Sequence, residues 1–193
     1  MFAALSSTAT DTEIHTIGRR VGGTVYTADP ENGGREMAFS SVVIAKDSDA
    51  LESVCDVALF EVDVRQIRHQ PRTWDVGQPT PGVVAVFGMV GRPDLTHGEV
   101  DDHWRDIHAP LALAHHPGMW HYHQVSVSEV VKGRAYDGIA LCAFASQYDL
   151  RQRFFTNDES RRIIRDDVSQ FCDTTNSPRR VLMTEYRYNP RQG

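Results

Sequence analysis

The residues best suited to move protons are concentrated between Thr96 and His123, which hold seven of the nine histidines and two of the three tryptophans. Imidazole titrates near neutral pH, so a histidine can accept a proton and return it within one reaction. His108 follows Trp104 by one helical turn, which makes the two side chains neighbours on a helix. We predict His108 as a catalytic proton carrier beside the indole wall of an apolar pocket. The alternative is a structural histidine bonded to a backbone carbonyl.

Tyr122 is the second candidate for a catalytic residue. Strand faces alternate with each residue, so Tyr122 is expected to share a face with Trp120 and Gln124. A phenol that donates to a carbonyl or enolate oxygen stabilises the negative charge that develops there. The alternative is a core tyrosine whose hydroxyl is satisfied by a neighbour.

His121 and His123 are expected on the strand face opposite Tyr122, where the two side chains could chelate a metal ion. No HExxH motif and no cysteine-rich spacing accompanies them. We therefore predict no metal and no cofactor, and favour packing of both histidines in an interior or against a partner subunit.

A helix beginning after Thr96 should carry His108. Thr96 and Glu99 have the spacing of a capping box, in which each side chain accepts a hydrogen bond from the other residue's backbone. Pro110 lacks an N–H, which predicts a kink or a stop near Ala109. One apolar face recurs at helical spacing, formed by Val100, Trp104, Ile107 and Leu111.

The C-terminal part of the chain, residues 82–188, has the element order of a ferredoxin-like α+β domain, βαββαβ. Strands are predicted at 83–90, 119–131, 139–145 and 181–188, with a second helical region over 147–172 that breaks near 156–157. The later part of that region has an apolar face containing Ile164, Val168, Phe171 and Cys172. Its charged residues indicate a solvated face without a function, namely Arg161, Arg162, Arg165, Asp166 and Asp167.

The N-terminal part is less distinct. We predict a flexible arm over residues 1–20 and a β-rich part over 21–70, followed by a proline-rich boundary at 69–81. Ala45 and Asp49 match Ala145 and Asp149 at a spacing of 100, each pair in a strand-then-helix setting. This similarity allows two interpretations of the N-terminal part: a degenerate ferredoxin-like repeat, or a segment that is only rich in strands.

Bulk composition excludes several classes of partner. The net charge of −6 argues against nucleic acid, which requires a basic face, and no apolar run approaches the ~20 residues of a membrane helix. Cys55, Cys142 and Cys172 are an odd number of cysteines without a CxxC pair, which is typical of a reducing compartment. We expect a cytoplasmic protein with a small-molecule partner.

Several motifs together resemble the EthD family, in the order HWRDIHAPLA, PGMWHYHQVSV, YDGIALCAFAS, FCD and MTEY. The resemblance implies a dimeric α+β barrel built from ferredoxin-like halves, and hence a homodimer in which a second subunit covers the sheet. The site is similar to that of methylmuconolactone methylisomerase, which implies that His108, Tyr122 and Cys142 meet in one pocket. That enzyme also has a histidine before the third strand, where this chain has VKGRAYDG and none.

These observations predict a cofactor-independent isomerase, lyase or cyclase for a small aromatic, lactone or polyketide-like substrate. His108 would carry the proton, and Tyr122 would hold the oxygen where charge develops. The substrate-binding wall is predicted from Trp104, Cys142, Phe87 and Phe144. A cofactor-free monooxygenase of an electron-rich aromatic and a non-catalytic small-molecule-binding accessory protein are the alternatives.

Overall fold

Two successive halves of the chain repeat one arrangement of helices and strands. The computed structural model describes residues 1–71 and 73–189. The first half contains β1 (Phe2–Ser6), α1 (Asp11–Val21), β2 (Gly23–Ala28), the 3₁₀ turn η1 (Pro30–Asn32), β3 (Ser41–Ala45), α2 (Ser48–Glu52) and β4 (Ala58–Arg68). The second half contains β5 (Val83–Met89), α3 (His97–His103), the π-helical segment η2 (Trp104–His108), α4 (Ala109–His115), β6 (Met119–Gly133), β7 (Gly138–Phe144), α5 (Gln147–Gln152), α6 (Asp158–Phe171) and β8 (Val181–Tyr188). Each half is therefore a βαββαβ unit.

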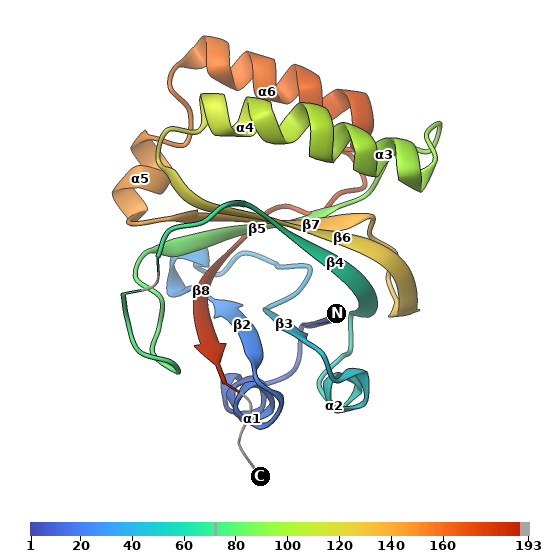
Figure 1. Cartoon of the computed structure of the whole chain (residues 1–193), viewed down its shortest axis with the longest axis vertical. Helices are drawn as coiled ribbons and strands as arrows, with labels where there is room; N and C mark the ends of the chain where they lie inside the picture. Colours follow the sequence, from blue (N-terminus) through green and yellow to red (C-terminus); the bar gives the residue numbers. More distant parts are fainter. Residues whose placement is uncertain (72, 190–193) are drawn as a thin grey trace.

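The strands of the two halves close into one barrel. The first half has the strand order β4-β1-β3-β2 and the second the equivalent order β8-β5-β7-β6. Antiparallel pairing of β2 with β8 and of β4 with β6 joins the halves, as Figure 1 shows between two groups of helices. The predicted ferredoxin-like α+β fold is confirmed, and the N-terminal repeat is a complete unit. The expectation that a second subunit covers the sheet is wrong, because the same chain supplies the second unit.

The prediction of a flexible arm over residues 1–20 is also wrong. β1 lies between β3 and β4 and pairs with both, so its backbone is hydrogen-bonded on two sides. The helix α1 begins at a capping box, in which Thr10 accepts from the Glu13 N–H and the Glu13 carboxylate accepts from the Thr10 N–H. Ile14 and Ile17 bury the inner face of this helix.

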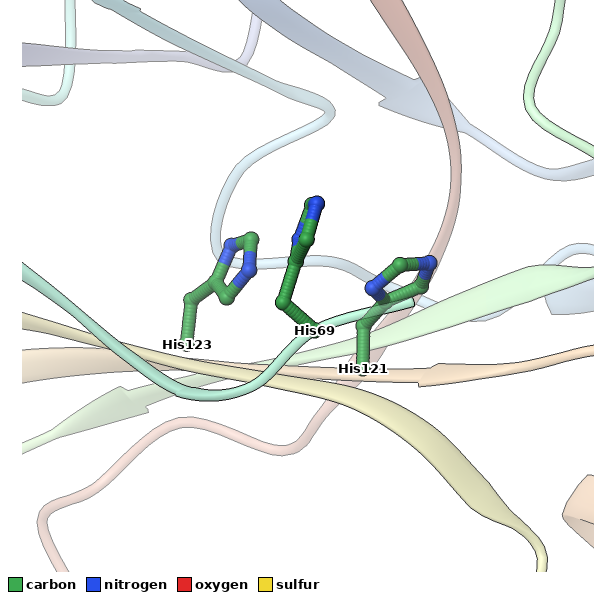
Figure 2. A group of neighbouring side chains, drawn as sticks. All are labelled: His69, His121 and His123. Atoms are coloured by element: carbon green, nitrogen blue, oxygen red, sulfur yellow. The ribbon is translucent and has the colours of Figure 1, made fainter. Parts of the chain in front are cut away.

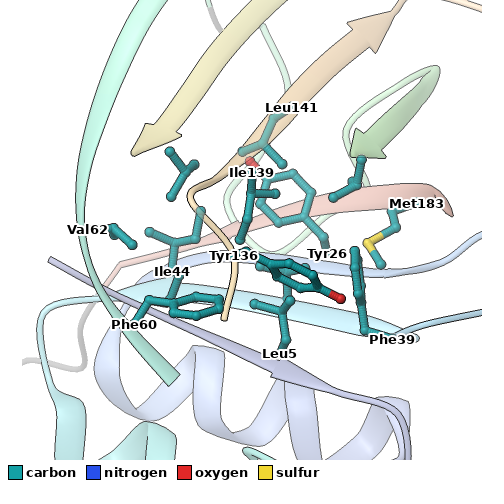
Figure 3. Close-up of a cluster of buried hydrophobic side chains, with 14 of the residues drawn as sticks. Leu5, Tyr26, Phe39, Ile44, Phe60, Val62, Tyr136, Ile139, Leu141 and Met183 are labelled. Carbon is teal, nitrogen blue, oxygen red and sulfur yellow. The ribbon is translucent and has the colours of Figure 1, made fainter. Parts of the chain in front are cut away.

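The barrel interior is a packed hydrophobic core (Figure 3). Leu5 and Phe60 from the first half meet Ile139 and Met183 from the second, and each is essentially inaccessible to solvent. Burying such a side chain stabilises a fold by about 1.5–3 kcal/mol, so this shared core holds the two halves together.

The helices cover the outer faces of the two sheets differently. In the first half, α1 and α2 pack on the sheet through a continuous apolar cluster that includes Ile14, Leu51 and Leu59. In the second half, η2, α4 and α6 lie over the sheet with a cavity beneath them. None of the described helices combines the length and the hydropathy that crossing a membrane requires.

Candidate functional site

A cavity of about 420 Å³ lies between the second sheet and its helices. Most of its wall is apolar, and the polar groups that reach it are few. Five of the six predicted site residues line it, namely Phe87, Trp104, His108, Tyr122 and Cys142. The sixth, Phe144, does not: its ring is fully buried behind Phe154, with 5.3 Å between the ring centroids. The predicted wall is therefore completed by other aromatic rings, Phe154, Phe155 and Phe171.

A π-helical turn sets the positions of Trp104 and His108. Of the kink or stop predicted near Ala109, the stop does not occur, because the helix continues to His115. The Ala109 N–H donates to the Trp104 carbonyl five residues earlier, and this widened turn accommodates Pro110 without breaking the helix. Trp104 and His108, the first and last residues of the turn, are both buried and both face the cavity.

His108 is held by a buried carboxylate. Its Nδ1 lies 2.7 Å from Asp167 Oδ2, and His103 Nε2 lies 2.9 Å from the other carboxylate oxygen. A carboxylate only accepts, so Nδ1 carries the proton and Nε2 of His108 remains to exchange a proton with the cavity. Burial alone would raise the pKa of Asp167, but the hydrogen bonds from the two histidines outweigh it and lower that pKa.

Asp167 is a functional candidate that the sequence analysis assigned to a solvated face. Its side chain is only 8% exposed, because it lies on the inner side of α6 with Ile164 and Phe171. Phe171 also packs on both imidazoles, with centroid distances of 4.8 Å to His103 and 5.3 Å to His108. The spacing contains a signal, since Asp167 follows Ile164 by three residues and precedes Phe171 by four.

Tyr122 belongs to a second buried network. Its hydroxyl oxygen accepts from Trp104 Nε1 at 3.0 Å and from Gln124 Nε2 at 3.1 Å. Gln124 Nε2 also donates to the Trp104 carbonyl at 2.8 Å, so the amide ties the strand to the π-helical turn. Neither bond uses the hydroxyl hydrogen. Burial raises the pKa of Tyr122, with a further contribution from Cys142, so the phenol stays neutral and can donate.

Two other titratable groups on the cavity wall, Cys142 and His116, are held neutral. Burial raises the pKa of the Cys142 thiol to about 12, which favours a small apolar contact over a nucleophile. His116 lines the cavity too, and its Nδ1 is hydrogen-bonded to the Phe154 carbonyl. Burial lowers the pKa of His116 to about 4. His108 is thus the histidine on this wall that an acidic partner supports.

A β-bulge at the start of β6 places Trp120 and Tyr122 on opposite faces of the sheet. Met119 pairs with Phe144 and His121 pairs with Ala143, which leaves Trp120 as an extra residue. Trp120 therefore packs toward the barrel interior, and the expectation that it shares a face with Tyr122 is wrong. His121 and His123 lie on the interior face, as Figure 2 shows together with His69.

The mouth of the cavity carries positive charge. Arg179 and Arg180 line it from the segment between α6 and β8, and both are exposed to solvent. The Arg180 guanidinium lies 5.6 Å from the ring centroid of Phe154. A cationic rim above an apolar chamber suits a ligand with an anionic substituent on a hydrophobic body.

Comparison with known proteins agrees with this architecture. None of the curated proteins matches the sequence. The crystal structure of an anthrone oxidase-like protein has a TM-score of 0.54 and 11% identity, over 96% of this chain and 90% of that one, which shows a shared fold. That of a proposed monooxygenase from Lactobacillus acidophilus NCFM has a TM-score of 0.48 and 8% identity, over 96% and 91%. The family model described as EthD domain matches residues 92–175, the segment that supplies His108, Tyr122, Cys142 and Asp167. The matched segment lies within the second half of a single-chain α+β barrel.

Proposed function

We propose that the protein is a cofactor-independent enzyme that isomerises, cleaves or cyclises a small ring-bearing acid by proton transfer. One observation carries the proposal: His108 and Tyr122 line the same apolar cavity, and Asp167 holds His108 through Nδ1. A base oriented by a carboxylate beside a neutral hydrogen-bond donor is suited to abstracting a proton next to a carbonyl group.

In this mechanism His108 Nε2 accepts a proton from a carbon adjacent to the substrate carbonyl. The electron pair of the broken C–H bond moves onto the carbonyl oxygen, which receives a hydrogen bond from Tyr122. Asp167 stabilises the imidazolium that forms. The proton then returns to a different carbon in an isomerisation, or to a departing oxygen in an elimination. In a cyclisation the enolate carbon attacks a second carbonyl, whose oxygen takes the proton.

The cavity limits the substrate class. A volume of about 420 Å³ lies within the range of about 300–1,000 Å³ that holds small organic ligands. The aromatic rings of Phe87, Trp104 and Phe154 offer flat surfaces for a ring. Arg179 and Arg180 at the mouth add a site for a carboxylate. We therefore favour an aromatic, lactone or polyketide-like acid.

Proton exchange tests the proposal without knowledge of the product. The protein is incubated in deuterated water with a panel of unsaturated lactones and aromatic keto acids, and NMR follows deuterium uptake next to the carbonyl. We expect uptake with at least one class, lost by ~10²-fold or more in His108→Gln. His97→Gln is the matched control, because His97 lies on the same helix outside the cavity wall.

Oxygen consumption measured in the same samples separates the proposal from its competitors. Oxygen uptake with an electron-rich phenol and no exchange would replace it with a cofactor-free oxygenase. Tight binding without exchange or oxygen uptake would make the protein a carrier. Equal exchange in wild type and His108→Gln would remove His108 from the mechanism.

A further inference from the structure

Three histidines gather on the barrel-interior face of β6, away from the cavity. His121 and His123 belong to β6, and His69 directly follows β4. One ring nitrogen from each residue lies within 4.8 Å of those of the other two. Figure 2 shows the His69 ring between the other two, with all three rings projecting to the same side of the sheet. Pairing of β4 with β6, which sets Gln66 opposite His123, creates this arrangement.

Two of these imidazoles are buried and incompletely hydrogen-bonded. His121 is 3% exposed and His123 is 8% exposed. Within the described part of the chain, neither Nε2 atom has a hydrogen-bond partner. A buried polar atom without a partner costs about 1–3 kcal/mol, so such atoms in a native fold call for an explanation. Coordination of a metal ion by both nitrogens would provide one.

We propose that His69, His121 and His123 form a binding site for a divalent transition metal ion. Three imidazole nitrogens are the donor set that Zn²⁺, Co²⁺, Ni²⁺ and Cu²⁺ prefer over Mg²⁺ or Ca²⁺, which take oxygen ligands. The site is independent of the proposed proton-transfer function, because its side chains project from the opposite face of β6.

Only a small movement is needed for coordination. In a tetrahedral site with metal–nitrogen bonds of about 2.0–2.1 Å, the ligand nitrogens are roughly 3.3 Å apart. The present nitrogens lie within 4.8 Å of one another, so each separation must shorten by at most about 1.5 Å. His69 is exposed at the end of a strand and can turn inward, while His121 and His123 are held by packing.

One hydrogen bond must be exchanged in the process. The Gln70 N–H donates to His121 Nδ1 at 3.2 Å, which leaves the proton of the neutral ring on Nε2. Coordination through Nε2 moves that proton to Nδ1, so the Gln70 contact is lost. Because Gln70 adjoins His69, the loss of this bond and the closure of His69 are one local rearrangement. A bound ion would then tie the segment after β4 to β6.

The surrounding charges permit a cation. Arg187 acts electrostatically on both His121 and His123 and by itself would repel a metal ion. Its guanidinium is ion-paired with the buried Glu185 carboxylate, which offsets much of that charge. Imidazole coordinates a metal ion in its neutral form, and burial lowers the pKa of both His121 and His123 to about 4, which favours that form.

Metal titration of the full chain without an affinity tag tests the site. The protein is stripped with a chelator and titrated with Co²⁺, whose visible d–d absorption reports a tetrahedral nitrogen site, and Zn²⁺ is then added in competition. We expect one equivalent with micromolar or tighter affinity. His69→Ala should weaken binding by at least about 100-fold, since loss of a direct ligand exceeds loss of a supporting contact.

His69→Ala is the informative variant because its exposed position leaves the fold intact, which circular dichroism verifies. His97→Ala, an exposed histidine on α3, is the matched control and should bind as wild type does. Zn²⁺ should raise the melting temperature of wild type and of His97→Ala but not of His69→Ala. Equal Co²⁺ spectra and equal Zn²⁺ shifts for all three proteins, or no stoichiometric binding, would overturn the proposal. The rings would then be a packing cluster only.

Discussion

His108 Nδ1 lies 2.7 Å from Asp167 Oδ2, although 59 residues separate the two in the chain and each belongs to a different helix. Both side chains are largely buried, at 11% and 8% exposure. The contact joins the π-helical turn to α6 across the roof of the cavity. It also decides which imidazole nitrogen faces that cavity.

Replacing Asp167 by Asn should reduce turnover by roughly 10²–10⁴-fold, because an amide neither fixes the Nδ1–H tautomer nor stabilises an imidazolium. The pH–rate profile should change as well, because the substitution removes the negative charge beside the imidazole. Asp166→Asn is the matched control, since that carboxylate is 53% exposed in surface ion pairs that contribute little. Equal pH profiles for the two variants would mean that Asp167 only packs.

Replacing Tyr122 by Phe should affect both stability and catalysis. The change leaves Trp104 Nε1 and Gln124 Nε2 without their shared acceptor, which costs about 1–3 kcal/mol in urea unfolding. Loss of the hydroxyl donor should lower kcat by roughly 10²–10³-fold with a smaller change in KM. Tyr148→Phe, at a residue 67% exposed, should alter neither quantity. Lower stability with unchanged kcat would make Tyr122 purely structural.

Gly138 should not tolerate a side chain. A Cβ there would lie 2.4 Å from Trp104 Cζ3, and the buried indole has little room to move. We expect Gly138→Ala to cost about 1–3 kcal/mol of unfolding free energy and to lower activity by displacing the cavity wall. The same substitution at Gly98 meets no atom within 4 Å and should stabilise α3 by about 0.5–1 kcal/mol. Equal effects at the two positions would contradict this account.

His116 should make the fold sensitive to mild acid. Its pKa is lowered to about 4 by burial, with smaller contributions from His108 and His115, whereas an unfolded histidine titrates near 6.5. Between these values the unfolded chain binds more protons, so the free energy of unfolding decreases as pH falls from about 6.5 to 4. The contribution of this residue reaches about 3 kcal/mol at pH 4.

His116→Asn should remove that part of the pH dependence. The amide can still donate to the Phe154 carbonyl but does not titrate. Urea unfolding of both proteins at several pH values isolates the effect, because the other histidines are common to them. As pH falls from 6.5 to 4, the wild type should lose about 3 kcal/mol of stability relative to the variant. Parallel curves would show that His116 does not titrate differently in the folded state.

Local signals in the sequence predicted most of the fold. The ordered helix that begins within residues 1–20 was not predicted, although the sequence contains a signal for it. The Thr96–Glu99 capping box correctly marked the start of α3. Thr10 and Glu13 have the same spacing and cap α1 in the same way, yet the polar composition of the first residues favoured a flexible arm. The apolar positions Ile14 and Ile17 were the additional evidence for a buried helix face.

The candidate site could be predicted only where its residues lie close together in the sequence. His108 and Tyr122 follow from helix and strand periodicity within one stretch. Asp167 was given to a solvated surface because its charge outweighed its position on the apolar face of α6. The approach of His69 to His121 depends on how β4 pairs with β6, which is a tertiary property.

Alternation along a strand fails where the backbone departs from regular pairing. The extra residue in β6 turns Trp120 to the interior, where it stacks on Trp74 at 5.7 Å, while Tyr122 keeps its place toward the helices. Phe144 points to the expected side, but Phe154 lies between it and the cavity. The alternation of strand residues between two faces predicts neither the orientation of Trp120 nor the position of Phe144 away from the cavity wall.

Because a single polypeptide forms the whole barrel, its two halves need not have the same sequence. In an assembly of two equal subunits, every substitution appears twice, so a change that improves one centre is imposed on the other. Here α1 and α2 pack on their side of the sheet through an apolar cluster, while the opposite side has the larger chamber. One half is thereby released to serve as scaffold, and the other can diverge in chemistry alone.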